Sequence, residues 1–437
     1  MMALLDEKSC ICVKSELDLF TVPPTQTSID HGCMVDYHPI AATLDAGPIE
    51  FNIPGTGDDY LDLANTYLHL IIKVKKGDGT DLVDANKVGP SNLLLHTLFS
   101  QVDVTLNDKL ISSSSNTYPY RAYLETLLNY GKAAKESQLT AALWYKDTAG
   151  KMDDTDMTAN VGLAKRGSIC AKSKSIDLLG RLHCDVFFQE KLLLNGVGVR
   201  IKLLRNKDSM ILLSGELNPA YKIVITKAVL RARKVSVSPA VTLSHAKWME
   251  RIPAKYPINR VECKTFSIPT GTLDVNQENV FMGQVPSRVI VGLVDHDAFN
   301  GNYKKNPFNF KNYKLNKMSL QLDAQNQPAK PFECNFDEGT FIEAYMSLFM
   351  GIGKAFKDED IDITREDYAN GYALYCFNLT PDLGENDHYS LVKNGSVRLG
   401  MAFAEALPNT VNVIVYAEFQ SVLEIDRNRN VSYDYAA

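Results

Sequence analysis

The sequence contains no hydrophobic run long enough to cross a membrane as a helix. The nearest stretch, residues 346–356, is interrupted by Gly351, Gly353 and Lys354, and it falls short of the ~18 apolar residues that a membrane span requires. Residues 1–8 also lack the basic start and the apolar centre of a secretory signal. We therefore expect a soluble protein without a transmembrane segment, made in a reducing compartment.

Cysteine is sparse, and its spacing is wrong for a metal site. No Cys-x-x-Cys pair occurs, and most cysteines stand in apolar segments where a free thiol packs as a small hydrophobic side chain. This reading is favoured over disulfides or zinc. The eight cysteines are at positions 10, 12, 33, 170, 184, 263, 334 and 376.

The chain has no excess of positive charge. Its formal net charge is -6 and its pI is about 5.8, which argues against a surface designed mainly to coat nucleic acid. Hydrophobic residues make up 45% and charged residues 22%, as in an ordinary globular protein rather than a disordered one. A length of 437 residues favours two domains of about 200 residues each.

Signatures of nucleotide binding and of hydrolytic catalysis are missing. The Gly-x-Gly pairs at 55–57 and 196–198 lack the third glycine of a dinucleotide-binding turn. Residues 353–355 read Gly-Lys-Ala, with Leu348 where a P-loop needs its leading glycine. The chain has no Gly-x-Ser-x-Gly and no His-Glu-x-x-His sequence. We expect no catalytic residues and no enzyme activity.

Two segments approach a metal-binding pattern without completing it. Residues 295–297 read Asp-His-Asp, but Ala298 stands where an iron-binding His-x-Asp pair needs its aspartate. Residues 358–362 present aspartates at the spacing of a calcium loop, but Ala369 replaces the closing glutamate. A loop histidine and a solvated acidic loop are the favoured readings, and no metal or cofactor is expected.

What the sequence does contain is the same order of elements twice. Each half has short alternating strands, one amphipathic helix and a closing block of strands around an Asn-Gly turn. The predicted helices cover residues 121–128 and 340–349. The closing blocks run over 187–203, with a turn at Asn195-Gly196, and over 389–401, with a turn at Asn394-Gly395.

The pattern favours a duplicated jelly-roll sandwich with long loops. Many short strands and one helix per half do not fit regular strand-helix alternation. Polar segments 131–175, 303–316 and 355–371 are expected as long loops, which often form interaction surfaces. The expected division is an N-terminal arm at 1–35, a first jelly roll at 36–238, a connection at 239–260, a second jelly roll at 261–425 and a flexible tail at 426–437.

Residues 302–314 interleave lysines with aromatic side chains. This mixture suits single-stranded nucleic acid, with phosphates on lysines and bases stacked on rings. It also suits a loop that docks on a neighbouring subunit. Because the whole chain is acidic, the subunit contact is favoured.

Five segments of the chain form a distinctive series when they are taken together. They are Leu17–Ile29 (LDLFTVPPTQTSI), Gly47–Phe51 (GPIEF), Leu61–Tyr67 (LDLANTY), Leu98–Val104 (LFSQVDV) and Asn116–Tyr123 (NTYPYRAY). The series resembles the hexon-like major capsid proteins of Polinton/Maverick elements and adintoviruses. The likeness is dense over most of the first half and looser over the second.

The resemblance implies an all-β double jelly-roll with minor helices: two eight-stranded antiparallel β-sandwiches side by side. Three copies would form a pseudo-hexameric capsomer, and capsomers would tile an icosahedral shell around double-stranded DNA. The arm would bind neighbouring copies or minor capsid proteins, and no sequence-specific contact with nucleic acid is implied. For arm docking we expect Phe20, Pro23 and Pro24, and for loop contacts between subunits Tyr145, Tyr303, Phe308, Phe310 and Tyr313.

Three alternatives stay open at this point. A minor capsid or penton protein belongs to the same class, although such proteins usually have one jelly roll. A carbohydrate-binding or hydrolytic β-sandwich would need convergent carboxylates or a metal in a pocket. An endogenous copy kept by a host, which no longer builds virions, is the third.

Overall fold

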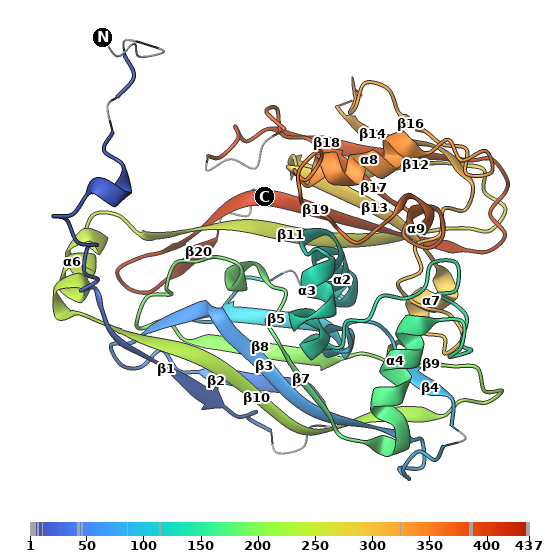
Figure 1. The fold of residues 1–437 in the computed structure, drawn as a ribbon, viewed down its shortest axis with the longest axis horizontal. Helices are drawn as coiled ribbons and strands as arrows, with labels where there is room; N and C mark the ends of the chain where they lie inside the picture. The colour runs from blue at the N-terminus through green and yellow to red at the C-terminus, as the bar shows by residue number, and fades with distance from the viewer. Residues whose placement is uncertain are drawn as a thin grey trace.

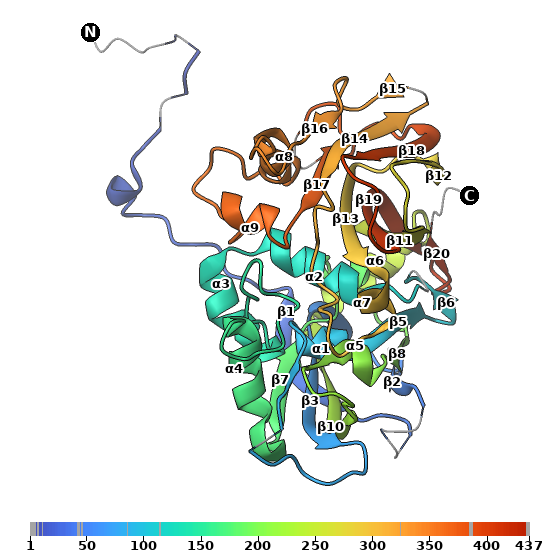
Figure 2. The same cartoon turned by 90° about the vertical axis from the view of Figure 1, so that its right-hand side faces the viewer.

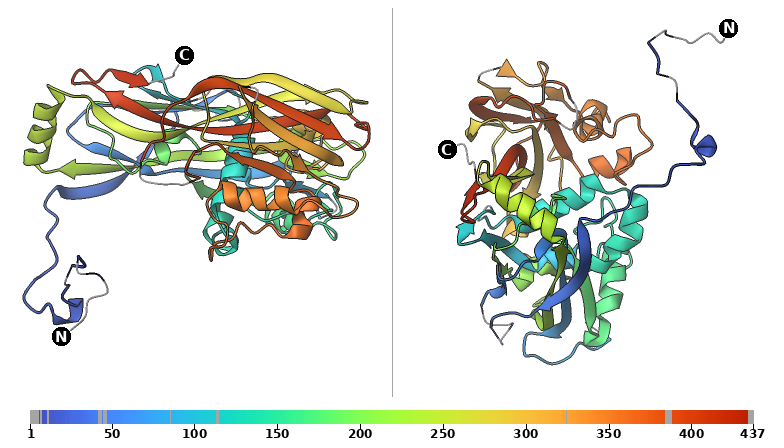
Figure 3. Two further views of the ribbon diagram at one scale, coloured as in Figure 1. Left: turned by 90° about the horizontal axis from the view of Figure 1, so that it is seen from above. Right: turned by 90° about the vertical axis from the view of Figure 1, so that its left-hand side faces the viewer.

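The computed structural model describes residues 6, 8–10, 12–41, 44, 47–84, 86–112, 115–323, 325–383 and 388–433. These residues form two β-rich halves, the first below and the second above in Figure 1. The N-terminal arm projects from one end of the first half and lies away from both halves in the views of Figures 1 and 3.

The first half consists of two four-stranded antiparallel sheets. Their strand orders are β1-β10-β3-β7 and β2-β8-β5-β6. A short pair, β4-β9, lies outside them. The strands are β1 (Ile29–Tyr37), β2 (Ile49–Ile53), β3 (Tyr60–Lys76), β4 (Val88–Pro90), β5 (Phe99–Leu106), β6 (Lys109–Leu110), β7 (Ile176–Gly180), β8 (Val199–Arg205), β9 (Leu212–Ser214) and β10 (Tyr221–Val237).

The second half again has two antiparallel sheets, here five-stranded. Their main paths are β11-β19-β13-β17 and β12-β18-β14-β15, with β20 added to β19 and β16 added to β14. The strands are β11 (Ala254–Ile268), β12 (Asp274–Gln284), β13 (Arg288–Asp295), β14 (Leu315–Leu322), β15 (Gln325–Asn326), β16 (Phe332–Glu333), β17 (Leu374–Asn378), β18 (Asn394–Phe403), β19 (Val411–Ile425) and β20 (Val431–Tyr433).

The two halves share one topology. In each half, the strands of the two main sheet paths are numbered here from first to eighth along the chain. One sheet then has the order first-eighth-third-sixth in both halves. The facing sheet has the order second-seventh-fourth-fifth in both halves. This is the strand order of a jelly roll, so the described residues confirm the predicted double jelly-roll of two eight-stranded sandwiches.

The core of each half follows from strand alternation. In β3, Leu68, Leu70, Ile72 and Val74 are fully buried, while the residues between them are partly exposed. Successive side chains of a strand point to opposite faces of the sheet, so this pattern places one face of β3 against the facing sheet. A one-residue slip of the strand would expose the whole apolar set, and burial therefore fixes the register.

Each half carries a helix of at least 10 residues at the same point of this topology. Helix α2 (Tyr118–Asn129) lies between the fifth and sixth strands of the first half, and α8 (Ile342–Gly351) lies between those of the second. Both predicted helices are confirmed. The remaining helices are α1 (Leu94–Thr97), α3 (Lys132–Glu136), α4 (Val161–Cys170), α5 (Asp208–Ile211), α6 (Pro239–Met249), α7 (His296–Asn300) and α9 (Arg365–Ala369), with short 3-10 turns η1 (Ser15–Leu17), η2 (Gln138–Ala142), η3 (Ala171–Ser173) and η4 (Asp185–Phe187).

Several expected boundaries differ from the structure. The predicted turn at Asn394-Gly395 is wrong, because both residues begin β18 and pair with Gln284 and Gly283 of β12. The expected loop 131–175 contains α3, η2, α4 and η3.

The segments expected at the ends and between the domains also carry regular structure. Strand β1 starts inside the expected arm, and the expected connection contains α6 and the start of β11. Strand β20 lies inside the expected tail, because it finds a pairing partner in β19. Residues 1–5, 7 and 11 of the expected arm and residues 434–437 of the expected tail lie outside the described residues.

Candidate assembly surfaces

Helix α2 forms the seam between the two jelly rolls (Figure 2). Its residues Tyr118 to Leu128 are buried, although an amphipathic helix on a sandwich would normally expose one face. The ring of Tyr123 stacks on Phe308 of the second half, with centroids 4.1 Å apart and planes 3° from parallel. Tyr120 stacks on Phe299, with centroids 5.5 Å apart. Such aromatic pairs contribute about 0.5–1.5 kcal/mol each beyond the burial of their surface.

A buried ion cluster crosses the seam beside these rings. Arg121 donates to Glu125 at 2.9 Å and to Asp185 at 2.6 Å, and His183 contacts the second oxygen of Glu125 at 2.6 Å. The backbone N–H of Val261, on β11, also donates to Asp185 at 3.2 Å. Together these bonds tie the first half to the leading strand of the second.

The cluster shifts the pKa values of its two carboxylates in opposite directions. Burial alone would raise the pKa of Glu125, but Arg121 and His183 hold that pKa below its ordinary value. Burial raises the pKa of Asp185, and the attraction of Arg121 opposes only part of this rise. Because the oxygens of both carboxylates are already bonded, their geometry fits a structural role better than acid or base chemistry.

Asp147 is the centre of a second buried network, here called the Asp147 hub. It lies between the helical insertion of the first half and the loops of the second. Its carboxylate is fully buried and forms an ion pair with Arg166 at 2.6 Å. It also accepts from Asn160 at 2.9 Å and from Asn306, in the second half, at 3.0 Å. The Tyr372 hydroxyl donates to its backbone carbonyl at 2.8 Å.

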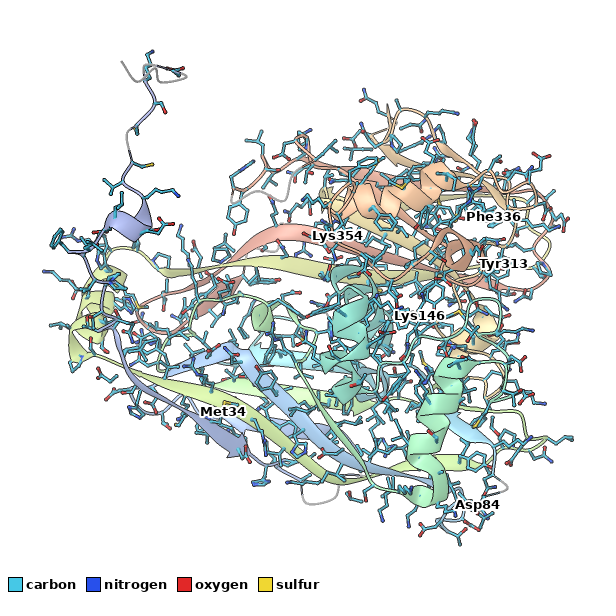
Figure 4. All side chains as sticks on the ribbon, in the orientation of Figure 1. Met34, Asp84, Lys146, Tyr313, Phe336 and Lys354 are labelled. Carbon is cyan, nitrogen blue, oxygen red and sulfur yellow. The ribbon has the colours of Figure 1, made fainter. Side chains whose placement is uncertain are left out.

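Three lysines extend the seam along α3 and the loop before α9. Lys135 is buried and donates to the carbonyls of Leu127 and Ile361, both at 2.7 Å. Lys146 pairs with Asp367 at 2.8 Å, and Lys354 donates to the carbonyl of Asn129 at 3.0 Å. Figure 4 shows Lys146 and Lys354 between the two halves.

The structure corrects the expected role of two loop aromatics. Phe308 and Phe310 have no exposed surface, since they pack on α2 within the same chain. They therefore hold the two jelly rolls together and offer no free surface to another subunit. The sequence pattern of alternating lysine and aromatic residues gave no sign of this partner, which is about 180 residues away in the chain.

The other expected contact residues are only partly buried. The Tyr303 hydroxyl donates to the carbonyl of Tyr221 at 3.1 Å, so this residue also bridges the halves. Tyr313 packs against the core from a backbone with a positive φ of 46°. The ring of Tyr145 lies 5.9 Å from the Lys165 ammonium. These three keep some accessible surface, and their contacts with other subunits stay predictions.

Three of the four lysines of the segment 302–314 form ion pairs within the described chain, and Lys304 is exposed. Lys305 contacts Asp295 and Asp297, each at 2.9 Å, and Lys311 contacts Asp153 at 2.6 Å. Lys314 contacts Asp337 and Glu405. Phosphate binding would have to compete with these carboxylates, so the geometry does not favour a nucleic-acid groove here.

The N-terminal arm is the most exposed apolar part of the described chain. Phe20 is 95% exposed, and Leu17, Leu19 and Val22 are at least 69% exposed. Pro23 and Pro24 follow in an exposed stretch without helix or strand. A row of large apolar side chains in water favours an interaction surface.

The motifs that approached a metal site are used for other contacts. The ring of His296 contacts the Asn412 side chain at 2.7 Å. Asp360 accepts from the backbone N–H of Lys132 at 2.9 Å, and Asp362 lies 3.5 Å from Lys146. Across the described residues, no group of three or more His, Cys, Asp or Glu side chains is arranged to hold a metal ion. All eight cysteines are free thiols.

A polar cavity of about 630 Å³ opens at the seam, next to the ion cluster. Its lining includes Asp185 and Glu418, the two carboxylates that a hydrolytic or carbohydrate-binding site would use. Each is held by an arginine, Asp185 by Arg121 and Glu418 by Arg288 at 3.3 Å. This pairing argues against the enzyme alternative. Among the helices of the described chain, none is long and apolar enough to span a membrane.

The network at the seam was missed from the sequence. Its one visible signal is the pair Arg121 and Glu125, spaced four residues apart on a helix that is otherwise apolar. Asp147 and Asp185 stand in polar or mixed segments and carry no such signal. Only the folded chain brings these carboxylates to buried guanidinium groups.

Comparison with known proteins gives one similar curated sequence. An uncharacterized protein of Caenorhabditis elegans is 26% identical over 426 residues, covering 94% of this chain and 99% of its own length. No known protein-family profile matches the sequence.

Comparison with solved structures supports the fold along the whole chain. A chain in the cryo-EM structure of the Sputnik virophage superposes with a TM-score of 0.64 at 11% identity, over 99% of this chain and 94% of its own. A chain of the PBCV-1 virus capsid gives 0.59 at 10% identity, over 96% and 100%. The mavirus major capsid protein gives 0.56 at 11% identity, over 99% and 96%.

These similar structures come from virus particles and capsids, not from enzymes. At such low identity the likeness defines the fold alone. The chain therefore has the double jelly-roll architecture that viral capsid proteins also have.

Proposed function

We propose that this chain is a major capsid protein of the Polinton/Maverick and adintovirus kind. Three copies would form a pseudo-hexameric capsomer, and capsomers would tile an icosahedral shell around double-stranded DNA in the virion. The observation that carries the proposal is the structural likeness to the mavirus major capsid protein, which covers 99% of this chain.

The seam supports this role physically. A capsomer needs rigid blocks with large lateral surfaces, and here α2, the Arg121 cluster and the Asp147 hub join two sandwiches into one body. Two rolls of one topology give each copy two similar edges. Threefold symmetry then gives six approximately equivalent edges, which fit a hexagonal lattice site.

The remaining surfaces have proposed partners. Tyr145, Tyr303 and Tyr313 keep accessible surface for contacts between copies, and the arm with Phe20, Pro23 and Pro24 would bind neighbouring copies or minor capsid proteins. No catalytic step, cofactor or sequence-specific contact with DNA belongs to the proposal.

Light scattering on the purified protein tests the oligomer. A capsomer predicts a particle of three times 48.6 kDa, or about 146 kDa. A stable monomer at all concentrations would contradict the proposal and would direct attention to the polar cavity at the seam.

A second candidate is an endogenous capsid-like protein kept by an animal host. The observation that favours it is the nematode relative, which matches nearly the full length of the chain. Such a protein would trimerise yet fail to form closed shells with DNA when expressed in animal cells, whereas a viral capsid protein would form them with its partners.

A further inference from the structure

An apolar groove lies at the end of the molecule where the arm leaves the first half. It has a volume of about 680 Å³ and is lined in part by residues of α6, the helix at this end of the molecule in Figure 3. Apolar side chains line most of it: Ile29, Leu192, Leu194, Val241, Trp248 and Ile252. Trp248 is 60% exposed and Ile252 is 52% exposed, so the groove is open to water in the single chain.

The arm offers a segment with matching chemistry. Residues 16–22 read Glu-Leu-Asp-Leu-Phe-Thr-Val, and their four large apolar side chains are exposed. Within the described chain, the hydrogen bonds of residues 12–22 stay inside the arm, such as that from Leu17 N–H to the Lys14 carbonyl at 2.9 Å. Both the groove and the arm segment thus present apolar surface that no part of the described chain covers.

Charge also matches between the two surfaces. The arm segment carries Glu16 and Asp18 between its apolar residues. Lys191 and Lys255 line the groove, where Lys255 also pairs with Glu424 at 3.2 Å, and Arg251 follows the end of α6. Complementary charges around an apolar centre orient a peptide and exclude wrong partners.

The root of the arm argues against docking in its own groove. Gln26 binds the backbone of Ile29 twice, accepting from its N–H at 2.8 Å and donating to its carbonyl at 3.1 Å. Pro23 and Pro24 precede this point with fixed φ angles. The chain would have to reverse within residues 23–28 to return to a groove that begins at Ile29. A second copy meets no such constraint.

We propose that the groove of one copy binds residues 16–22 of a second copy, with Phe20 placed among Val241, Trp248 and Ile252. The inference deepens the assembly role proposed above and rests on it, since it assigns the surface that receives the arm. In this arrangement the arm of one copy connects it to the next copy.

Photochemical cross-linking of the full chain tests the contact. The photoreactive amino acid p-benzoylphenylalanine replaces Phe20, and this protein is mixed with an equal amount of ¹⁵N-labelled wild-type chain before irradiation. Mass spectrometry should find cross-links from position 20 to residues 237–256 of the labelled copy. Cross-links to the same copy, to another surface, or none at all would overturn the proposal. The same probe at Leu217, which is 89% exposed, should not reach the groove.

Variants of the groove provide the second part of the test. Trp248→Ala removes an exposed groove residue and should lower the cross-link yield about tenfold, as loss of a central tryptophan does in interfaces. Leu243→Ala is the matched control, because Leu243 is 72% exposed on the same helix but does not line the groove. An equal loss in both variants would overturn the assignment.

Light scattering of the same samples separates the two proposals. Trimers that cross-link elsewhere would defeat only the groove assignment. Cross-links into the groove of a second copy without any trimer would defeat only the capsomer.

Discussion

At the scale of single residues, the strongest constraints are buried charges that pair across the seam. Asp147 and Arg166 have fully buried side chains and contact each other at 2.6 Å. Burying an ion costs several kcal/mol unless a partner and further hydrogen bonds compensate it. Asp147 has these bonds on both carboxylate oxygens, so the pair fixes a single arrangement of the segments around it.

The first prediction concerns this pair. Asp147→Ala leaves the Arg166 guanidinium buried without its carboxylate and should lower the free energy of unfolding by about 3–5 kcal/mol. Urea titration followed by fluorescence measures the change. Asp177→Ala is the control, because the Asp177 carboxylate is 72% exposed in its pair with His69 and should contribute about 1 kcal/mol or less. Equal effects of the two variants would contradict the role of the hub.

A second prediction concerns Lys135. Burial lowers the pKa of its ammonium from 10.5 to about 7. Between these values the unfolded chain keeps a proton that the folded chain has released, so rising pH favours the folded state. The wild type should gain stability relative to Lys135→Met from pH 7 to pH 10, by up to about 1.4 kcal/mol per pH unit.

The comparison of these two proteins isolates Lys135 from other groups that titrate in this range. Lys132→Met is the control, because the Lys132 side chain is 59% exposed. A stability difference between wild type and Lys135→Met that stays constant from pH 7 to pH 10 would show that the ammonium is not desolvated.

A third prediction concerns the thiols. Burial raises the pKa of Cys170, Cys184, Cys263, Cys334 and Cys376 to about 12, and a thiol without thiolate character reacts slowly. Ellman's reagent at pH 8 should therefore titrate only the exposed Cys10, Cys12 and Cys33 in the native protein and all eight cysteines after denaturation. Rapid reaction of more than three thiols would show that the cores open readily.

At the scale of elements, the C-terminal hairpin of β19 and β20 links the two jelly rolls. This link lies near one end of β11, away from the α2 seam. Arg429, in the turn between β19 and β20, donates to the Asn195 carbonyl at 2.7 Å and to its side-chain oxygen at 2.9 Å. Asn107 donates to the Arg429 carbonyl at 2.9 Å. The turn that the sequence predicted at Asn195-Gly196 is thus also a docking point for the end of the chain.

The fourth prediction tests this link. Arg429→Ala should lower the free energy of unfolding by about 1–3 kcal/mol, because it leaves the acceptor groups of Asn195 unsatisfied. It should also speed hydrogen exchange in β20, measured by mass spectrometry. Arg427→Ala, on the same turn but exposed, is the control. Unchanged exchange in β20 would show that the hairpin does not depend on Arg429.

Elements with strong local patterns could be predicted from the sequence. The helix predicted at 121–128 is confirmed as part of α2 because its apolar spacing is helical, and the closing block predicted at 187–203 contains most of β8. The Asn-Gly dipeptide gave a correct turn at 195–196 and a wrong one at 394–395. The same local preference was overridden at the second position, because β12 supplies a pairing partner for Asn394.

The assembly residues were harder to predict because their contacts, too, depend on partners that the local sequence does not show. The aromatic and lysine pattern of 302–314 suggests exposure when read locally. Its phenylalanines are buried against α2, and three of its four lysines are paired with carboxylates outside the segment. Neither kind of partner is visible from the pattern. The docking of the arm through Phe20, Pro23 and Pro24 stays a prediction, because the described arm residues 12–22 are exposed in the single chain.

At the scale of the whole molecule, the central observation is that one topology occurs twice and is joined by a buried seam. The eight strands in the main sheet paths of each half pair in the same order, and the halves share one rigid boundary around α2. This arrangement gives a single chain two similar outer edges, which is the property that a pseudo-hexameric block requires.

Electron microscopy of the vitrified protein tests this account most directly. Class averages of the main chromatographic peak should show particles with threefold symmetry and a hexagonal outline, with two density lobes for each copy. Single copies with two lobes and no symmetric assembly, or rings with another number of copies, would contradict the account.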